Sequence, residues 1–290
     1  MATRAVFVPP LAAVPTLGGS GTPVKIGGGA PLALIAGPCV IESSEHLLKM
    51  AEAIVAIARD KDIPLIFKSS FEKANRTSGS SFRGLGRSAG LAALAAVRDK
   101  LGVPLLTDVH TEEDVYAAAE VVDVLQIPAF LCRQTSLLEA AGSTGKTVLI
   151  KKGQFLAPED MRYAADKVSG SGKESGVLLC ERGACFGYRE LVVDFRGLAV
   201  MRESGWPVVF DATHSVQIMG GAGGASGGNR KYVPLLARAA VAVGVDCVFL
   251  EVHDNPDVAP SDGPNMLPLE SLGPLLEDLQ AIAKLSLHTR

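Results

Sequence analysis

The sequence predicts an α/β protein in which strand-helix units repeat and close into a single barrel. The chain has 290 residues, of which 48% are hydrophobic, and a chain of this size can bury about three quarters of its unfolded surface. After residue 30, short apolar runs alternate with longer segments of helical spacing, a pattern typical of a parallel sheet. Eight such units fill about 250 residues, the usual size of a (β/α)8 TIM barrel. A doubly wound open sheet is the alternative architecture.

The expected elements follow one another in regular order. Short apolar runs predict strands at residues 32–36, 65–68, 105–107, 124–127, 148–151, 177–180, 208–211 and 247–251. Apolar residues with helical spacing predict helices at residues 45–59, 87–100, 112–121, 134–141, 158–168, 195–204, 232–243 and 269–284. No long linker divides the chain, so we expect residues 31–290 to form one barrel domain.

The first part of the chain, residues 1–30, is expected to be an extension outside the barrel. We expect residues 5–8 and 24–26 to pair as a short hairpin that closes one end of the barrel. Three prolines interrupt the apolar stretch that begins at residue 5, and only Arg4 precedes it. This pattern argues against a signal peptide.

Composition excludes several classes of partner. A net charge of -3 gives no general attraction to nucleic acid or to an anionic membrane, and a single tryptophan provides no base-stacking platform. No apolar stretch approaches the ~18 residues of a membrane helix. Five cysteines at irregular spacing, without a CxxC pair, fit a reducing compartment. We therefore expect a cytoplasmic protein that binds neither nucleic acid nor membrane.

Four potential metal ligands lie at or just past the ends of apolar runs that are far apart in sequence: Cys39, His214, Glu251 and Asp262. Each alone has an ordinary structural explanation. Parallel strands bring their carboxyl ends to one rim, however, so these residues are expected to share one cation. A thiolate, an imidazole and two carboxylates suit a divalent Zn, Fe, Mn or Co ion better than Mg or Ca.

Cationic residues also follow the predicted strands, namely Lys68, Lys73, Arg76, Lys151 and Arg182. They come from three strand ends, so the barrel can direct them into the same mouth. Lysine acts there as a mobile point charge, whereas arginine can bind a phosphate or carboxylate through two parallel hydrogen bonds. Such convergence in a slightly acidic protein predicts a small anionic, phosphorylated substrate.

A glycine-rich segment at residues 218–229 holds six glycines. It has neither the GxxxxGK[ST] pattern nor the GxGxxG spacing of nucleotide-binding loops. Its permissive backbone favours a lid over the barrel mouth, and a plain surface loop explains the composition equally well.

Nine motifs, in this order, resemble the 3-deoxy-D-manno-octulosonate 8-phosphate synthase family: IAGPCVIES (35–43), FKSSFEKANRTS (67–78), TDVH (107–110), QIPAFLCRQT (126–135), IKKGQF (150–155), ERGACFGY (181–188), LVVDFRGL (191–198), FDATHSVQ (210–217) and SDGPNMLPL (261–269). The resemblance implies a transferase that condenses phosphoenolpyruvate with D-arabinose 5-phosphate and water. The products are 3-deoxy-D-manno-octulosonate 8-phosphate and phosphate, on the way to the Kdo of lipopolysaccharide.

The resemblance also implies roles for single residues. The phosphate and carboxylate of phosphoenolpyruvate are expected at Lys68, Lys73, Lys151 and Arg182, and the pentose phosphate at Asn75, Arg76 and Thr77. Cys39, His214, Glu251 and Asp262 match the ligands of the metal-requiring branch, in which Cys39 replaces the Asn of the metal-independent branch. The DGP turn that begins at Asp262 instead resembles the metal-independent branch. A homotetramer is implied, since the family binds the pentose phosphate partly across a subunit boundary.

We expect Lys151 and His214 to lie closest to the reacting atoms, with Lys73 and Asp108 as further candidate catalytic residues. Thr77 stands where the family usually has Ser, and Arg189 and Glu190 also depart from its pattern. The alternatives are the sister reaction with erythrose 4-phosphate, a phospho-sugar sensor without turnover, and a metalloaldolase that does not use phosphoenolpyruvate. The KANRTS motif favours the five-carbon acceptor.

Overall fold

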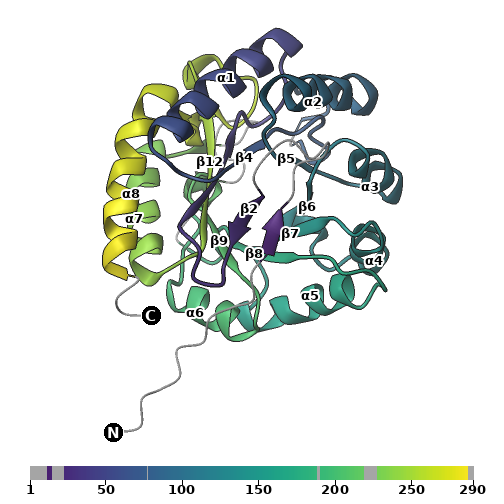
Figure 1. Ribbon diagram of the computed structural model, residues 1–290, viewed down its shortest axis with the longest axis vertical. Coiled ribbons are helices and arrows are strands. Elements are labelled where there is room, and N and C mark those ends of the chain that lie inside the picture. Colours follow the sequence, from purple (N-terminus) through teal and green to yellow (C-terminus); the bar gives the residue numbers. More distant parts are fainter. Residues whose placement is uncertain (1–11, 15–22, 77, 188–189, 219–226, 287–290) are drawn as a thin grey trace, which may run out of the picture.

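The chain folds into a closed barrel of parallel strands surrounded by helices (Figure 1). The computed structural model describes residues 12–14, 23–76, 78–187, 190–218 and 227–286. In this part of the chain, eight strands follow one another around the barrel in the order β3, β4, β5, β6, β7, β8, β9 and β12. Because β12 pairs in parallel with both β3 and β9, the sheet closes on itself. The predicted TIM barrel is confirmed, and the open-sheet alternative is wrong.

The barrel strands are β3 (Ala33–Gly37), β4 (Leu65–Lys68), β5 (Leu105–Asp108), β6 (Val124–Ile127), β7 (Thr147–Lys151), β8 (Val177–Glu181), β9 (Val208–Asp211) and β12 (Cys247–His253). The main helices are α1 (Ser44–Asp60), α2 (Arg87–Leu101), α3 (Glu112–Ala119), α4 (Thr135–Ser143), α5 (Met161–Ser169), α6 (Arg196–Glu203), α7 (Val233–Val243) and α8 (Leu272–Ser286). Two short pairings lie at the catalytic end: β10 (Gln217–Ile218) with β11 (Gly227–Gly228), and β13 (Leu267–Pro268) with β12.

The predicted N-terminal hairpin is present, but one of its strands differs from the prediction. Strand β2 (Val24–Ile26) pairs in antiparallel fashion with β1 (Ala12–Val14), whereas the sequence predicted residues 5–8, which lie outside the described residues. The alternating burial of β1 explains the difference, since Val14 is buried with Ile26 inside the barrel end. The hairpin closes the amino-terminal end of the barrel.

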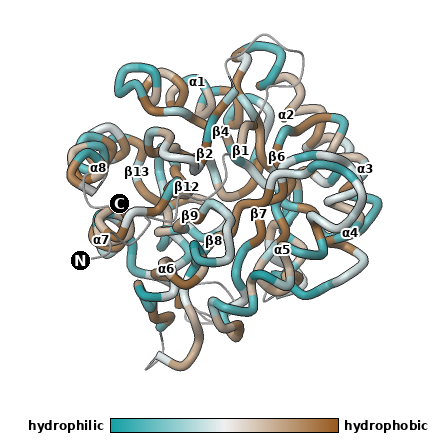
Figure 2. Tube along the Cα trace, turned by 60° about the horizontal axis from the view of Figure 1, so that its bottom comes forward, coloured by the Kyte–Doolittle hydropathy of each residue, from teal (hydrophilic) through white to brown (hydrophobic). Residues whose placement is uncertain are grey.

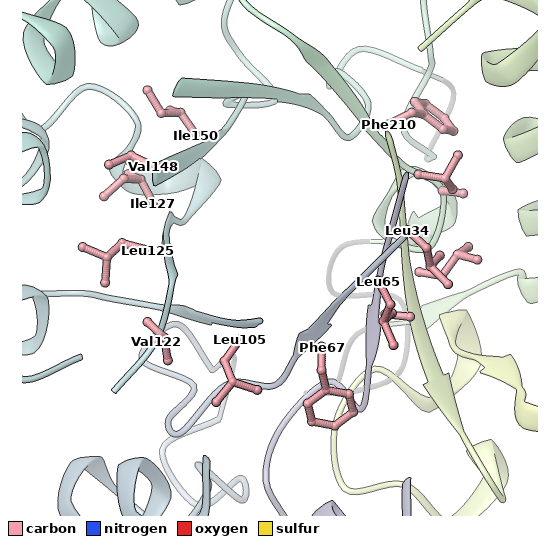
Figure 3. Close-up of a cluster of buried hydrophobic side chains, with 14 of the residues drawn as sticks. Leu34, Leu65, Phe67, Leu105, Val122, Leu125, Ile127, Val148, Ile150 and Phe210 are labelled. Carbon is pink, nitrogen blue, oxygen red and sulfur yellow. The ribbon is translucent and has the colours of Figure 1, made fainter. Parts of the chain in front are cut away.

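Two hydrophobic layers hold the barrel together because successive side chains of a strand point to opposite faces. Ile35, Ile66 and Phe249 belong to the cluster inside the barrel, which also includes the hairpin. Leu34 and Phe67, their neighbours in sequence, belong to the larger cluster between strands and helices. Figure 3 shows this outer cluster pointing away from the barrel axis.

Hydrophobic residues are concentrated on the strands, and the outer helices carry mixed residues (Figure 2). In the part of the chain described here, no helix combines the length and the hydrophobicity that crossing a membrane requires.

Local signals fix the helix ends. Ser43 caps α1 by accepting a hydrogen bond from the amide of His46 at 3.1 Å, and Thr111 and Asp114 form a capping box at α3.

Candidate active site

A cavity of about 570 Å³ opens at the carboxyl ends of the strands, a size typical of a small-molecule site. Its lining comes from the segments that follow β4 to β9 and β12, and includes Lys73, Asn75, Arg76, Asp108, His110, Lys151, Arg182, Asp211, His214, Gln217, Glu251 and Asp262. A larger hollow of about 1360 Å³ lies at the opposite end, beside β2, α1 and α2. The catalytic candidates all gather at the first cavity, as the strand-end argument predicts.

Cys39, His214, Glu251 and Asp262, here called the Cys39 group, meet at this end of the barrel. The Sγ of Cys39 lies 3.4 Å from Oδ2 of Asp262. The Nε2 of His214 lies 3.7 Å from Oε2 of Glu251 and 3.8 Å from Oδ2 of Asp262. Ligand atoms of Cys39, Glu251 and Asp262 all lie within 4.8 Å of one another.

This spacing fits a divalent metal ion. Four ligands at about 2.0–2.3 Å from a tetrahedral ion lie roughly 3.5 Å from one another. The Oε2 of Glu251 is buried and has no hydrogen-bond partner among the described residues. Burial, Glu251 and Asp262 together raise the pKa of the Cys39 thiol well above its usual value, although Lys73 and Lys68 oppose the shift. A cation bound at the group would satisfy the carboxylate and favour the thiolate.

Lys68 takes a different place from the other cations. It is 1% exposed and is not among the residues that line the cavity. Its Nζ donates to Oε1 of Glu251 at 2.6 Å and to the carbonyl of Cys39 at 2.9 Å. Burial would raise the pKa of Glu251, but Lys68, His214 and Lys73 hold it at about 2. In this structure Lys68 therefore orients two members of the Cys39 group.

Asp211 connects Lys151 and His214. Its Oδ2 accepts hydrogen bonds from Nζ of Lys151 and from Nδ1 of His214, the latter at 2.7 Å. Lys151 Nζ also lies 3.3 Å from the ring centre of Phe249. Burial opposes ionisation of Asp211, but His214 and Lys151 hold its pKa well below the usual value. An Nδ1–H donated to this carboxylate leaves the Nε2 lone pair facing the Cys39 group.

A second titratable set lies on the side of β4 and β5. The Nε2 of His110 is 3.1 Å from Oδ2 of Asp108, and Nζ of Lys73 is 3.9 Å from Oε1 of Glu251. Burial would raise the pKa of Asp108, but Lys73 and His110 lower it strongly. The pKa of Lys73 lies above its usual value, because Cys39, Glu251 and Asp108 outweigh burial. These shifts keep Asp108 ionised and Lys73 protonated near neutral pH, so the two groups present fixed charges at the cavity.

Two arginines of the cavity each have a buried N–H donor that makes no hydrogen bond to the described residues. Arg182 donates from Nη2 to Oε1 of Gln217 at 2.8 Å, and Arg76 donates from Nη1 to Oγ of Ser261 at 2.6 Å. Within the described residues, Nη1 of Arg182 and Nε of Arg76 have no hydrogen-bond partner. Burial lowers the pKa of Arg182, although arginine stays charged near neutral pH. Unpaired guanidinium donors in a cavity are suited to a phosphate or a carboxylate.

Some features predicted from the sequence lie outside the described residues, and some residues of the site were given no role from the sequence. Thr77, Arg189 and residues 219–226 of the predicted lid lie outside the described residues. Sequence reasoning gave no role to Asp211, Gln217 or Ser261, although Asp211 stands three residues before His214. That spacing was the one available signal, since Asp211 is the last residue of the strand that His214 follows.

Comparison with known proteins places the chain in one family. The model of the DAHP synthetase I family matches residues 13–286. A 2-dehydro-3-deoxyphosphooctonate aldolase of Desulfatibacillum aliphaticivorans is 58% identical over 264 residues, which cover 91% of this chain and 96% of that protein. One from Magnetococcus marinus is 58% identical over 262 residues, covering 90% and 91%. One from Synechococcus sp. is 59% identical over 248 residues, covering 86% and 87%. The similarity includes every strand and loop that forms the cavity.

Proposed function

Because the chain belongs to the DAHP synthetase I family, we propose that it condenses phosphoenolpyruvate with D-arabinose 5-phosphate and water. The products are 3-deoxy-D-manno-octulosonate 8-phosphate and phosphate, on the route to the Kdo of lipopolysaccharide. This is the activity of the relatives named 2-dehydro-3-deoxyphosphooctonate aldolase, which cover nine tenths of the chain. The observation that carries the proposal is the cavity in which Arg76 and Arg182, each with an N–H donor unpaired among the described residues, adjoin the Cys39 group.

In this reaction, C3 of phosphoenolpyruvate attacks the aldehyde carbon of the sugar and water adds at C2. Phosphate then leaves as the bond between C2 and its oxygen breaks. We propose that Arg182, Lys151 and Lys73 hold the phosphate and carboxylate of phosphoenolpyruvate. Asn75, Arg76 and Thr77 are proposed to hold the pentose phosphate. Fixed cations of this kind stabilise the negative charge that develops during the reaction, and holding two substrates together removes the entropy cost of their encounter.

The two titratable sets are proposed to flank the bound substrates. Asp108 and Lys73 are proposed to stand on one side of the bound substrates, and Lys151 with His214 on the other. Asp211 orients both Lys151 and His214 through its Oδ2. Lys68 is proposed to act through Glu251, which it contacts at 2.6 Å, rather than through the substrate. This differs from the role that the family resemblance implies for Lys68.

We propose that Cys39, His214, Glu251 and Asp262 hold one divalent ion of Zn, Fe, Mn or Co. When bound, such an ion supplies a Lewis acid that can polarise a carbonyl oxygen or lower the pKa of water. Support comes from the spacing of the donor atoms and from Oε2 of Glu251, which has no hydrogen-bond partner in the described part of the chain. The DGP turn at Asp262 does not remove these ligands.

We further propose a cytoplasmic homotetramer. All five cysteines are free thiols in the described residues, in keeping with a reducing compartment. Phe186 is 93% exposed, and Phe130, Phe155 and Val192 are each at least half exposed. Phe130 also lines the cavity, and exposed apolar surface is typical of interaction sites such as subunit interfaces. Sedimentation of the purified protein measures this directly, and a monomer at micromolar concentration would contradict it.

The decisive assay measures phosphate release from phosphoenolpyruvate with arabinose 5-phosphate, before and after treatment with a chelator. We expect activity that is lost on chelation and restored by added metal. Erythrose 4-phosphate as the better acceptor would support the sister reaction. Tight binding without phosphate release would support a sensor, and turnover with pyruvate or dihydroxyacetone phosphate a metalloaldolase. Full activity after chelation, with Cys39→Asn as active as the wild type, would remove the metal proposal alone.

A further inference from the structure

Ser261 lies where the substrate cavity meets the Cys39 group. It directly precedes Asp262, whose backbone is left-handed with φ of 50°, and it is 2% exposed. Its Oγ lies 3.2 Å from Sγ of Cys39 and accepts a hydrogen bond from Nη1 of Arg76 at 2.6 Å. Arg76 also donates from Nη2 to the carbonyl of Pro260 at 3.1 Å. The guanidinium of Arg76 thus donates hydrogen bonds to both the backbone and the hydroxyl of this turn.

The direction of these hydrogen bonds follows from the groups themselves. A guanidinium can only donate, whereas a hydroxyl both donates and accepts. Arg76 therefore uses a lone pair of Ser261, and the hydroxyl proton stays available for another neighbour. When Cys39 carries its proton, S–H can donate to Oγ. A cysteine sulfur bound to a metal carries no proton and can only accept a hydrogen bond. The hydrogen bond across the 3.2 Å contact would then run from the Ser261 hydroxyl to the sulfur.

Few hydrogen-bonding groups contact this sulfur. In the described part of the chain, Sγ has two hydrogen-bonding contacts, to Ser261 Oγ and to Asp262 Oδ2. An ionised carboxylate cannot donate, so the contact with Asp262 becomes repulsive when the thiol loses its proton. Lys68 donates its hydrogen bonds to the carbonyl oxygen of Cys39 and to Glu251. The positive charges of Lys73 and Lys68 also attract the sulfur and oppose the rise in the pKa of its thiol.

We propose that Ser261 is a positioning residue that donates a hydrogen bond to the Cys39 thiolate, with its hydroxyl oriented by Arg76. The inference rests on the proposed metal at the Cys39 group. It adds a partner that orients and tunes a ligand, and such partners commonly change metal affinity about 10- to 100-fold when removed. The same arrangement joins Arg76 to the metal ligand through one hydroxyl. Arg76 lines the cavity, and its Nε has no hydrogen-bond partner among the residues that the structure describes.

The test uses the full-length protein loaded with Co²⁺, whose thiolate-to-metal absorption band reports on the sulfur. Cobalt affinity is measured by competition with a chelator. Ser261→Ala is expected to bind Co²⁺ about 10- to 100-fold more weakly, and its band is expected to move to longer wavelength, because the thiolate loses a hydrogen bond. Ser261→Thr keeps a hydroxyl and is expected to restore both properties toward those of the wild type.

A matched control is Ser175→Ala, which removes a buried hydroxyl that donates to the carbonyl of Gly142 at 2.8 Å, away from the cavity. It is expected to leave the cobalt band and affinity unchanged. Cys39→Asn is expected to lose the band, which assigns it to this thiolate. A wild-type band with Ser261→Ala indistinguishable from it would overturn the role of Ser261 and leave the metal proposal standing. Absence of the band in the wild type would overturn the metal proposal, and the role of Ser261 with it.

Discussion

The buried ion pair of Lys68 and Glu251 allows the sharpest prediction about stability. Lys68→Met keeps most of the side-chain volume but removes the charge that Glu251 faces. The two groups are 1% and 0% exposed, and their charged atoms lie 2.6 Å apart. At an effective dielectric constant of about 20, that separation corresponds to a Coulomb attraction of roughly 6 kcal/mol. The net value is smaller, because both charges lost their hydration on folding.

Removal of one partner from a buried pair usually costs about 3–5 kcal/mol, since the other charge stays buried. Lys73 remains 3.9 Å from the same carboxylate oxygen, so we expect a loss of about 3 kcal/mol, at the lower end of that range. Glu251→Gln in the same chain removes the stranded charge. We therefore expect the double variant to be less destabilised than the sum of the two single variants by about 2 kcal/mol.

Urea unfolding followed by circular dichroism, at one protein concentration and with chelator present, measures these differences. The matched control is Lys49→Met, which breaks the 2.7 Å pair of Asp254 with a lysine whose side chain is 69% exposed, and it should cost less than about 1 kcal/mol. The pKa of Glu251 is lowered to about 2, so the stability from its ionised form is present above the unfolded value of about 4.3 and is lost as pH falls toward 2. A loss for Lys68→Met no larger than that for Lys49→Met would refute the reasoning.

Three further predictions follow from the same geometry. Asp108→Asn is expected to lower the pKa of His110, which Asp108 raises against the effect of burial. The stabilising contribution of that charged imidazole is complete below about pH 6.5 and is lost as pH rises through the folded pKa; NMR titration of the ring measures the shift. Gly37→Ala places a Cβ 1.8 Å from the carbonyl oxygen of Lys68 and is expected to cost about 3 kcal/mol in urea unfolding, whereas Gly79→Ala, with nothing within 4 Å, should stay within about 0.5 kcal/mol. Arg182→Lys keeps the charge but loses the two-pronged donor, so steady-state kinetics should show KM for phosphoenolpyruvate about 10- to 100-fold higher, and an unchanged KM would count against Arg182 as its ligand.

The barrel was predictable because its strands are continuous apolar runs between polar segments. The strand at Leu65–Lys68 has the predicted bounds, but Cys247–His253 extends two residues beyond its prediction. Polar residues such as His253 remain in the strand because the rim provides partners for them, here Glu42 at 2.8 Å from Nε2. The main helix α5 begins at Met161 rather than at Pro158, because the proline starts a short 3₁₀ turn.

The location of the Cys39 group was predictable from strand ends, but its neighbours were not. Whether a strand-end lysine reaches the cavity or an adjacent carboxylate depends on the approach of neighbouring strands. At Gly37 the backbone of β3 comes so close to Lys68 that no side chain fits, and Lys68 turns to Glu251. Ser261 reaches the site through a loop that includes the left-handed backbone of Asp262, and Gln217 through the two-residue strand β10. Hydrophobic periodicity encodes neither conformation.

The charges around the cavity connect the metal and the assembly to substrate binding. The described part of its lining carries four cations (Lys73, Arg76, Lys151 and Arg182) and four carboxylates (Asp108, Asp211, Glu251 and Asp262). Phosphoenolpyruvate brings a carboxylate and a phosphate, and the sugar brings a second phosphate, each phosphate with a charge of about −1.5 to −2 near neutral pH. A balanced lining cannot neutralise both substrates, so further positive charge is needed. A divalent ion at the Cys39 group is one source in the proposed function. A neighbouring subunit of the proposed homotetramer is the other, since the family resemblance implies a pentose phosphate site partly across a subunit boundary. Chelation and dissociation of the oligomer should therefore both weaken substrate binding, in addition to slowing the reaction.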